Sequence, residues 1–333
     1  MKMLFLIQGQ EVAASRYRVL QYLPYLKAKG VETEVMPYPA TTEQLYTFFR
    51  NLPDYDCLFL QRKRFHGLLL KLLRKRANKI VYDFDDAVMY KNSKASSPYS
   101  ATRHKRFAAM VKASDYVIAG NNFLKEQAEK FTGHATVIPT AIDESRYRAK
   151  EYDLRKEKVT IGWIGDHGSI HYLEKMRPVF EELGKKYPHV ELEIICDIFF
   201  DCDNIPVVRR IWSAEHEIEY LHELDIGVMP LVQDPWSEGK CGLKILQYFG
   251  VGVPAVCTPV GVNKDVVREG FNGYFANSPE QWIEKLSLFI EDQEKQKIMG
   301  MRGREIVFQS FSLAACAPKL YDVLLETVSR KDT

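Results

Sequence analysis

Residues 235–263 read PWSEGKCGLKILQYFGVGVPAVCTPVGVN and contain, in order, a loop, a helix and a strand. The loop ends at Gly239, and the spacing of the apolar residues predicts a helix from about Cys241 to Phe249. Glycines then predict a turn, and the short apolar run Pro254–Cys257 predicts a buried strand. A helix followed closely by a buried strand is typical of an α/β fold.

Two lysines, Lys240 and Lys244, stand at the start of this predicted helix. A helix N-terminus carries partial positive charge, so lysines there are unfavourable unless an anion lies between them. Phosphate groups bind at such loop-to-helix junctions. Lys240, Lys244 and Gln247 are spaced i, i+4, i+7 and are expected to share one helix face. The pattern predicts that this face lines a phosphate-bearing ligand; the alternative is two solvated lysines on a surface helix.

The rest of the chain alternates strands and helices, which predicts parallel sheets with crossover helices. The expected strands are Met3–Ile7, Val31–Met36, Cys57–Gln61, Lys79–Asp83, Tyr116–Ala119, Ala135–Ile138, Val159–Ile164, Val190–Cys196, Val207–Trp212 and Ile226–Met229. The expected helices are Arg16–Lys29, Gln44–Leu52, Gly67–Ala77, Phe107–Ala113, Phe123–Phe131, Tyr172–Lys186, Glu217–Leu224, Gln281–Ile290, Gln293–Phe308 and Leu313–Ser329.

The length of 333 residues suits two domains rather than one compact core. A polar, charged stretch without apolar periodicity begins at Asp143 and predicts a linker at residues 146–158. We therefore expect one Rossmann-like domain at residues 1–145 and another at residues 159–312. A last helix within residues 313–333 is expected to pack back toward the first domain. Two doubly wound sheets of this kind imply a ligand cleft outside the carboxyl ends of their strands.

The composition is that of a soluble globular protein, with 46% hydrophobic and 27% charged residues. A net charge of +2 gives no indication of nucleic-acid binding, and no nucleic-acid partner is expected. No apolar run approaches the roughly 20 residues of a membrane span. The apolar run at the start ends by Ile7, which predicts a strand rather than a signal peptide. The six cysteines form no C-x-x-C pair and are expected to be reduced thiols in a cytoplasmic protein, the alternative being a bond between Cys196 and Cys202.

Four motifs of the C-terminal half resemble the nucleotide-sugar-binding domain of GT-B glycosyltransferases. They are LDIGVMPL at residues 224–231, Gly242-Leu243, GVPAV at residues 252–256 and GFNG at residues 270–273. The likeness is to the large, mostly retaining group 1, or family 4, type, which includes many bacterial envelope-polysaccharide enzymes. The resemblance implies a UDP- or GDP-sugar donor held by the second domain and a glycan, glycolipid or other hydroxyl acceptor held by the first. It also implies that no cofactor and no metal is needed, because positive side chains and helix dipoles take the place of a metal.

The resemblance also assigns residues to the donor. Gly242 and Leu243 lie where the family binds the diphosphate. The family carries two glutamates eight positions apart around this element, and here the first position is Gly239, with Glu238 displaced by one, while the second is Gln247. Glu238 and Gln247 are therefore expected beside the nucleoside. The first loop of the second domain, residues 165–171, lacks the family's arginine and lysine, so their role falls to Lys240 and Lys244.

Three aspartates, Asp83, Asp85 and Asp86, follow a predicted strand in the sequence VYDFDDAV. Carboxylates this close repel one another, so a metal, an acceptor hydroxyl or sugar hydroxyls are expected to draw them together. We expect Asp85 and Asp86 to be catalytic. The alternative is a helix N-cap with solvated acids.

Further candidates lie in loops after predicted strands. Arg16 and Arg18 follow Ser15, a candidate N-cap, and arginines in a first helical turn favour an anion, so Arg16 is expected at the diphosphate; a surface ion pair is the alternative. His167, with His171, is a candidate for stabilising the leaving group, although loop histidines are more often surface residues. Trp212 is a candidate for stacking on the base, against the alternative of core packing.

The predicted helix at residues 67–77 is leucine-rich and basic, and Arg62, Lys63 and Arg64 stand just before it. Such a helix is able to lie against anionic lipid, which predicts peripheral contact with the inner face of a membrane. The alternative is a sheet-packing helix with a solvated face. Two other functions remain open at this point: a sugar-nucleotide epimerase on the same fold, and a nucleotide-binding module without catalysis.

Overall fold

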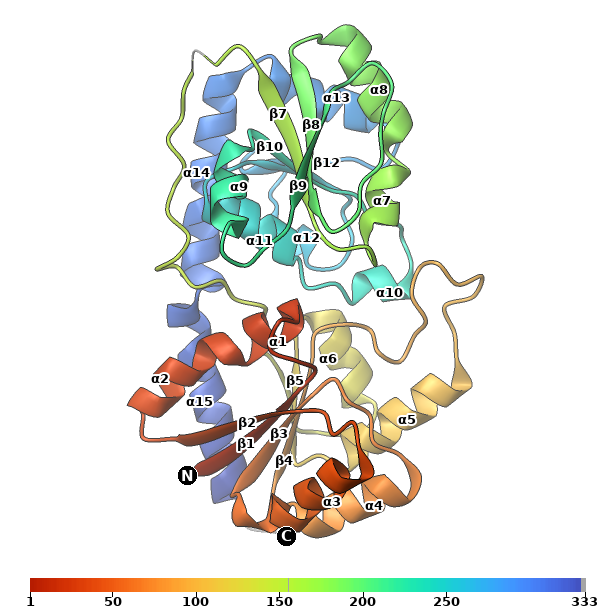
Figure 1. The fold of residues 1–333 in the computed structure, drawn as a ribbon, viewed down its shortest axis with the longest axis vertical. Coiled ribbons are helices and arrows are strands. Elements are labelled where there is room, and N and C mark those ends of the chain that lie inside the picture. Colours follow the sequence, from red (N-terminus) through yellow and green to blue (C-terminus); the bar gives the residue numbers. More distant parts are fainter. Residues whose placement is uncertain (155, 331–333) are drawn as a thin grey trace. The chain divides into compact units, whose positions relative to one another are not determined.

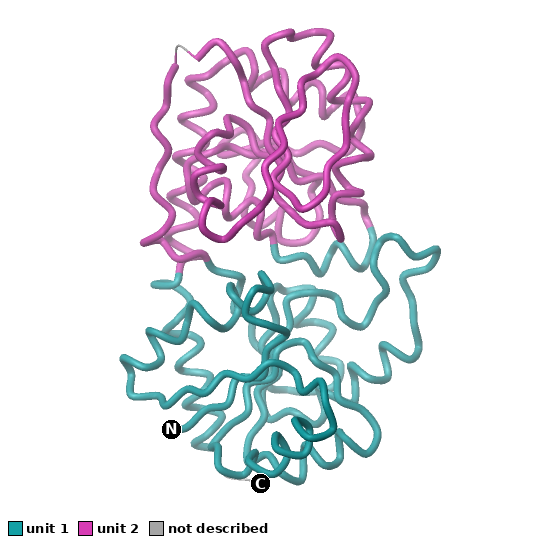
Figure 2. Tube along the Cα trace, in the orientation of Figure 1, with its two compact units in different colours: residues 1–141, 234–241, 313–333 teal, residues 142–233, 242–312 magenta. Residues whose placement is uncertain are grey.

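The computed structural model describes residues 1–154 and 156–330. The chain divides into two compact units of similar size (Figure 2). Unit 1 consists of the described residues of 1–141, 234–241 and 313–333, and unit 2 consists of the described residues of 142–233 and 242–312. The short segment 234–241 thus belongs to unit 1, although it lies inside the stretch expected to form the second domain.

Unit 1 is built on a six-stranded, fully parallel sheet of order β2-β1-β3-β4-β5-β6. Residues of β1, β3 and β4 are almost all buried, because parallel strands covered by helices on both faces are apolar throughout. The strands are β1 (Lys2–Ile7), β2 (Glu32–Pro37), β3 (Cys57–Gln61), β4 (Ile80–Phe84), β5 (Tyr116–Ala119) and β6 (Ala135–Val137).

Helices cover both faces of this sheet (Figure 1). One face packs against α2 (Leu23–Ala28) and α15 (Leu313–Ser329) in a single hydrophobic cluster, which also includes Val19, directly after α1 (Ala13–Arg18). The opposite face packs against α3 (Thr42–Asn51), α4 (Gly67–Arg76), α5 (Ala101–Lys112) and α6 (Asn122–Glu129) in another.

The prediction of a single helix at Arg16–Lys29 is wrong, because two helices, α1 and α2, occupy this region. The chain leaves helical geometry at Val19, where φ is −130° and ψ is −64°, and a short 3₁₀ turn at Leu20–Tyr22 precedes α2. Pro24 lies in the first turn of α2, the one place where a helix tolerates proline without losing a hydrogen bond. The apolar periodicity continues through both helices, so it did not reveal the break.

Unit 2 repeats the plan with a six-stranded parallel sheet of order β12-β11-β10-β7-β8-β9. The strands are β7 (Val159–Ile164), β8 (Val190–Cys196), β9 (Val207–Ile211), β10 (Ile226–Met229), β11 (Ala255–Cys257) and β12 (Gly273–Phe275). The helices are α7 (Ile170–Glu174), α8 (Arg177–Lys186), α9 (Glu217–Glu223), α11 (Leu243–Gly250), α12 (Asn263–Val266), α13 (Pro279–Ile290) and α14 (Gln293–Ser310), while α10 (Pro235–Glu238) belongs to unit 1.

Both sheets are doubly wound, which confirms the expected fold class. In each sheet the strand order reverses once, between β1 and β3 in unit 1 and between β7 and β10 in unit 2. Ligands of open parallel sheets bind outside the carboxyl ends of the strands at this reversal. No helix within residues 1–154 and 156–330 is long and apolar enough to cross a membrane.

Candidate functional site

Asp83, the first of the three aspartates, forms a buried ion pair with Arg18. Asp83 is the fourth residue of β4, and the Arg18 guanidinium of α1 binds both of its carboxylate oxygens, with Nε 3.2 Å from Oδ2. Arg18 also donates to the backbone oxygen of Ile138 at 2.6 Å. Because both side chains are buried, this pair fixes α1 against the sheet and is not available to a ligand.

Asp85 and Asp86 are bridged by one arginine, Arg62, which follows β3. Its Nε binds Asp85 Oδ1, and its Nη2 lies 2.7 Å from Asp86 Oδ2. Arg62 has a φ of 53°, in the left-handed region that non-glycine residues rarely adopt. Burial acts to raise the pKa of Asp85, but the Arg62 charge and hydrogen bond outweigh it and lower that pKa below its usual range. The repulsion between these aspartates is thus relieved by arginine.

A second cation reaches Asp86 from the segment 234–241. Lys240 Nζ lies 3.1 Å from Asp86 Oδ1 and 4.9 Å from the centre of the Trp236 ring. Asn121 holds this segment by donating from Nδ2 to the backbone oxygens of Glu238 and Lys240, both at 3.1 Å. Gly239 is required here because an added Cβ would lie 2.6 Å from Ala87 Cβ and 2.8 Å from its backbone nitrogen. The segment therefore positions Lys240 over the carboxylates of unit 1.

The prediction that Lys240 lies on a helix face is wrong. The helix α11 begins at Leu243, not at about Cys241, so Lys240 precedes it and does not share a face with Lys244 and Gln247. The helix begins late because Gly242, its N-cap, has a φ of 71°, and only from Leu243 onward is the backbone helical.

Arg16 does not lie in the first turn of a helix, where the sequence predicted it. Val12, not Ser15, is the N-cap of α1, so Arg16 and Arg18 lie in its last turn, where the helix dipole favours cations. Ser15 is buried and donates from Oγ to Gln61 Oε1 at 2.9 Å. A role for Arg16 at the donor stays a prediction without support from the dipole.

Unit 2 presents the N-terminus of α11 at the reversal of its sheet. Tyr248 of this helix joins the two strands concerned, since its hydroxyl donates to the Val228 oxygen of β10 and accepts from the Ile164 nitrogen of β7, both at 3.2 Å. Lys244 lies in the first turn of α11, with Nζ 5.0 Å from the centre of the Trp163 ring. The left-handed N-cap, the N-terminal end of the helix dipole and this lysine together form a site suited to an anion.

His167 lies in the loop after β7 and is held by Asp197, which follows β8. Its Nδ1 is 2.6 Å from Asp197 Oδ2, and its backbone nitrogen donates to Asp197 Oδ1 at 2.8 Å. The hydrogen bond from His167 lowers the pKa of Asp197. Both side chains are exposed, so the pair presents an oriented imidazole to solvent.

The two nucleoside candidates of unit 2 differ in their surroundings. Gln247 is buried in α11, at 3% exposure. Trp212 follows β9 and is partly buried; its Nε1 donates to Glu217 Oε2 at 2.9 Å, which fixes the orientation of the indole. Glu238 belongs to α10 in unit 1.

Sequence reasoning missed the partners of these residues. Arg62 was grouped with the basic helix that follows it, and Asp197 and Asn121 were not considered. A usable signal existed for Arg62, because the ends of neighbouring parallel strands lie together and the aspartates required a nearby cation. Within residues 1–154 and 156–330 no group of three or more His, Cys, Asp or Glu side chains is arranged to hold a metal.

Residues 184–292 match the family described as Glycosyl transferases group 1. An N-acetyl-alpha-D-glucosaminyl L-malate synthase of Bacillus anthracis is 21% identical over 346 aligned positions, covering 98% of this chain and 85% of that protein.

Solved structures of low sequence identity share the fold. A sucrose-phosphate synthase from Thermosynechococcus elongatus superposes with a TM-score of 0.76 at 13% identity, covering 98% of both chains. Anabaena HepE in complex with UDP and glucose has a TM-score of 0.71 at 15% identity, covering 98% of this chain and all of that one. The chain therefore shares the GT-B fold of these structures, and its resemblance to the group 1 glycosyltransferases is confirmed.

Proposed function

We propose that the protein transfers a sugar from a UDP- or GDP-sugar to a hydroxyl acceptor, with the donor bound by unit 2. The observation that carries this proposal is the N-terminus of α11, where Gly242, Leu243 and Lys244 lie at the reversal of the sheet. A diphosphate there gains charge-assisted hydrogen bonds and the favourable end of the helix dipole. HepE, which shares the fold, was solved in complexes with UDP and with UDP-glucose.

The resemblance to the group 1 enzymes supports the remaining donor contacts that we propose. Gln247 and Trp212 of unit 2 are proposed for the nucleoside, together with Glu238. Lys240 and Arg16 are proposed as further cations for the diphosphate. Electrostatic stabilisation of the departing diphosphate is the main contribution expected of these groups, and no metal ion is required for it in this proposal.

We propose that Asp85 and Asp86 of unit 1 position other groups. The lowered pKa of Asp85 makes it a weak base, so we do not assign it to removing a proton. We propose instead that Asp85 and Asp86 hold Arg62 in place and accept hydrogen bonds from acceptor or sugar hydroxyls. His167, oriented by Asp197, is proposed to donate toward the leaving group. Attack on the face from which the diphosphate departs requires no protein nucleophile and retains the anomeric configuration.

We further propose that the acceptor belongs to bacterial envelope glycan or glycolipid synthesis and that α4 touches the cytoplasmic membrane surface. Only Leu73 of this helix is fully buried, whereas Leu68, Leu69 and Leu72 are 82%, 39% and 38% exposed. Exposed leucines beside basic residues support contact with anionic lipid.

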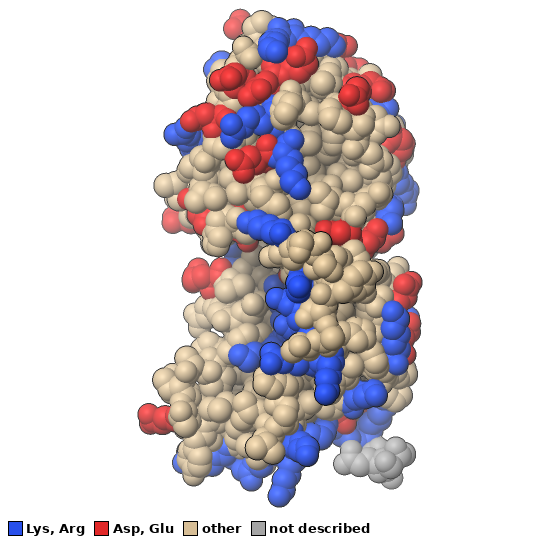
Figure 3. Space-filling view, turned by 90° about the vertical axis from the view of Figure 1, so that its right-hand side faces the viewer, with Lys and Arg blue, Asp and Glu red and all other residues tan. Residues whose placement is uncertain are grey.

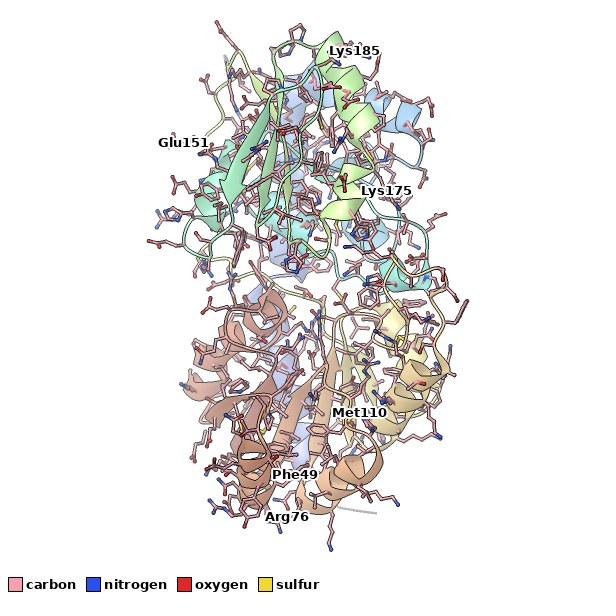
Figure 4. All side chains as sticks on the ribbon, turned by 45° about the vertical axis from the view of Figure 1, so that its right-hand side comes forward. Phe49, Arg76, Met110, Glu151, Lys175 and Lys185 are labelled. Carbon is pink, nitrogen blue, oxygen red and sulfur yellow. The ribbon has the colours of Figure 1, made fainter. Side chains whose placement is uncertain are left out.

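Calorimetric titration with UDP and GDP tests the donor site. Lys244→Ala is expected to weaken binding of the preferred nucleotide roughly ten- to a hundredfold, since a hydrogen bond to a charged group is worth about 1.5–3 kcal/mol. Lys175→Ala, at an exposed position of unit 2 (Figure 4), is the matched control and should bind normally. Equal affinity in the wild type and the Lys244 variant would rule out the site.

A further inference from the structure

Unit 1 contains a cavity of about 410 Å³ outside the carboxyl ends of its strands. Residues that follow each of the first four strands line it, together with Arg106 of α5 and Trp236 of α10. Gln8 after β1 and Arg62 after β3 lie on the two sides of the sheet reversal. Arg62 Nη1 lies 3.4 Å from Gln8 Oε1, so the two loops meet there. The cavity thus occupies the position where an open parallel sheet binds a ligand, and its volume suits a small molecule.

Cationic side chains dominate the wall of this cavity. Arg62, Lys63, Arg64 and Arg106 line it, against the single carboxylate of Asp86. The charge of Arg62 is already balanced by Asp85 and Asp86. Figure 3 shows that basic side chains gather on one face of unit 1.

The other three cations have no such balance. In the described part of the chain, Lys63, Arg64 and Arg106 form no ion pair with a carboxylate. Arg64 donates from Nη1 to the Val88 backbone oxygen, and Lys63 Nζ lies 4.9 Å from the centre of the Tyr38 ring. Burial, together with the charges of Arg103 and Arg106, lowers the pKa of Arg64, which shows that these cations repel one another. An anion in the cavity would remove that repulsion.

We propose that this cavity binds the phosphate group of a phosphorylated acceptor, with Lys63, Arg64 and Arg106 as its ligands. A phosphate ester carries about −1.5 to −2 charges and three strong acceptor oxygens at neutral pH, which matches three unbalanced cations better than one carboxylate does. Trp236 supplies an aromatic wall for the part of the molecule that carries the hydroxyl. As an acceptor site the cavity rests on the proposed function, whereas its affinity for phosphate esters does not.

The test is calorimetric titration of the full chain with glycerol 3-phosphate and glucose 6-phosphate, using glycerol and glucose as uncharged controls. Titrations with and without saturating UDP separate this cavity from the donor site. Arg106→Ala and Lys63→Ala are each expected to weaken phosphate-ester binding about tenfold or more. Lys105→Ala is the matched control, because Lys105 is an exposed neighbour on α5 that does not line the cavity.

Binding that is absent, or that is unchanged by both Arg106→Ala and Lys63→Ala, would overturn the proposal. Titration with dihexanoyl phosphatidic acid, below its micellar concentration, distinguishes the source of the phosphate. Binding of this lipid in competition with glycerol 3-phosphate indicates a lipid head group, whereas binding of the soluble esters alone indicates a soluble acceptor. If UDP fails to bind while phosphate esters bind and respond to Arg106→Ala, the donor proposal fails, and the cavity stands as a phosphate-ester site without its role as acceptor site.

Discussion

The aspartates after β4 owe their arrangement to arginines from elements distant in sequence. Arg18 lies 65 residues before Asp83, and Arg62 lies 23 residues before Asp85. Spacing alone suggested that a ligand was needed to hold the carboxylates together. The fold supplies cations instead, because α1 and the loop after β3 both reach the end of β4.

Removing Arg18 should destabilise unit 1 strongly. Arg18→Met leaves the Asp83 carboxylate buried without its partner, and breaking a buried ion pair in this way costs about 3–5 kcal/mol. Adding Asp83→Leu should recover at least half of that loss, since an apolar pair carries no uncompensated charge. Urea-unfolding curves measure both effects.

The exposed pair of Lys125 and Glu129 provides the control for this prediction. Lys125→Ala should change the free energy of unfolding by less than about 1 kcal/mol, as surface ion pairs contribute little. A loss in Arg18→Met no larger than in Lys125→Ala would show that the buried pair does not stabilise unit 1.

At the residue scale the sequence predicted which positions are chemically unusual better than it predicted their partners. A helix after Gly239 was predicted correctly, but its start was placed at about Cys241 rather than at Leu243. The start depends on the left-handed backbone of Gly242, which the apolar spacing does not reveal, and Lys240 was therefore assigned to a helix face. The partners of Arg62 and Trp212 come from other elements and depend on tertiary contacts.

Among the elements, α4 carries the clearest surface prediction. Its last basic residues are engaged: Arg74 pairs with Asp115, and Arg76 donates to the backbone oxygen of Phe49, beside which it lies in Figure 4. Lys71 and Lys75 are exposed next to Leu68. We expect Lys71→Glu with Lys75→Glu to weaken binding to phosphatidylglycerol vesicles more than tenfold, at about 1 kcal/mol for each basic residue near the surface.

Vesicle co-sedimentation measures this change. The control is the double variant Lys185→Glu with Lys175→Glu, which changes two exposed lysines of unit 2 and alters the net charge by the same amount. Equal loss of binding in the two double variants would mean that net charge, not α4, drives association.

A buried glutamate on β8, Glu193, predicts a pH dependence of stability. Glu193 of β8 is buried, and burial, reinforced by the nearby Glu223 carboxylate, raises its pKa to about 7. The folded state therefore holds a proton that the unfolded state releases near pH 4.5, so the wild type should lose stability as pH rises from about 4.5 to 7. Between pH 4.5 and 7 the free energy of unfolding of Glu193→Gln should rise by about 3 kcal/mol relative to that of the wild type. Parallel pH–stability curves for the two proteins would contradict this account of Glu193.

Element boundaries could be predicted where strands are buried on both faces. The bounds of β3, β5, β7, β8 and β10 agree with the apolar runs, since turn residues or charges end each run abruptly. The break between α1 and α2, and that between α7 and α8 before Pro178, interrupt patterns that stay amphipathic throughout. The three-residue strand β12 was missed because so short an apolar run carries no period.

At the scale of the whole molecule, the two units are not two consecutive halves of the chain. The last helix, α15, packs on the sheet of unit 1, and the segment 234–241 joins unit 1 from within the second half. The alternation of strands and helices predicted two doubly wound sheets correctly. It could not assign 234–241, because that assignment depends on Asn121 and Asp86, far away in sequence.

The most direct test of the central claim is a mass-spectrometric transfer assay. The wild type and Lys244→Ala are incubated with a panel of UDP- and GDP-sugars and with glycerol 3-phosphate and glucose 6-phosphate as acceptors. We predict that at least one donor releases its nucleoside diphosphate, that an acceptor gains the mass of one glycosyl residue, and that Lys244→Ala lowers the rate roughly ten- to a hundredfold. Conversion of a nucleotide sugar into its isomer without diphosphate release, or binding of donors that are never cleaved, would contradict the account.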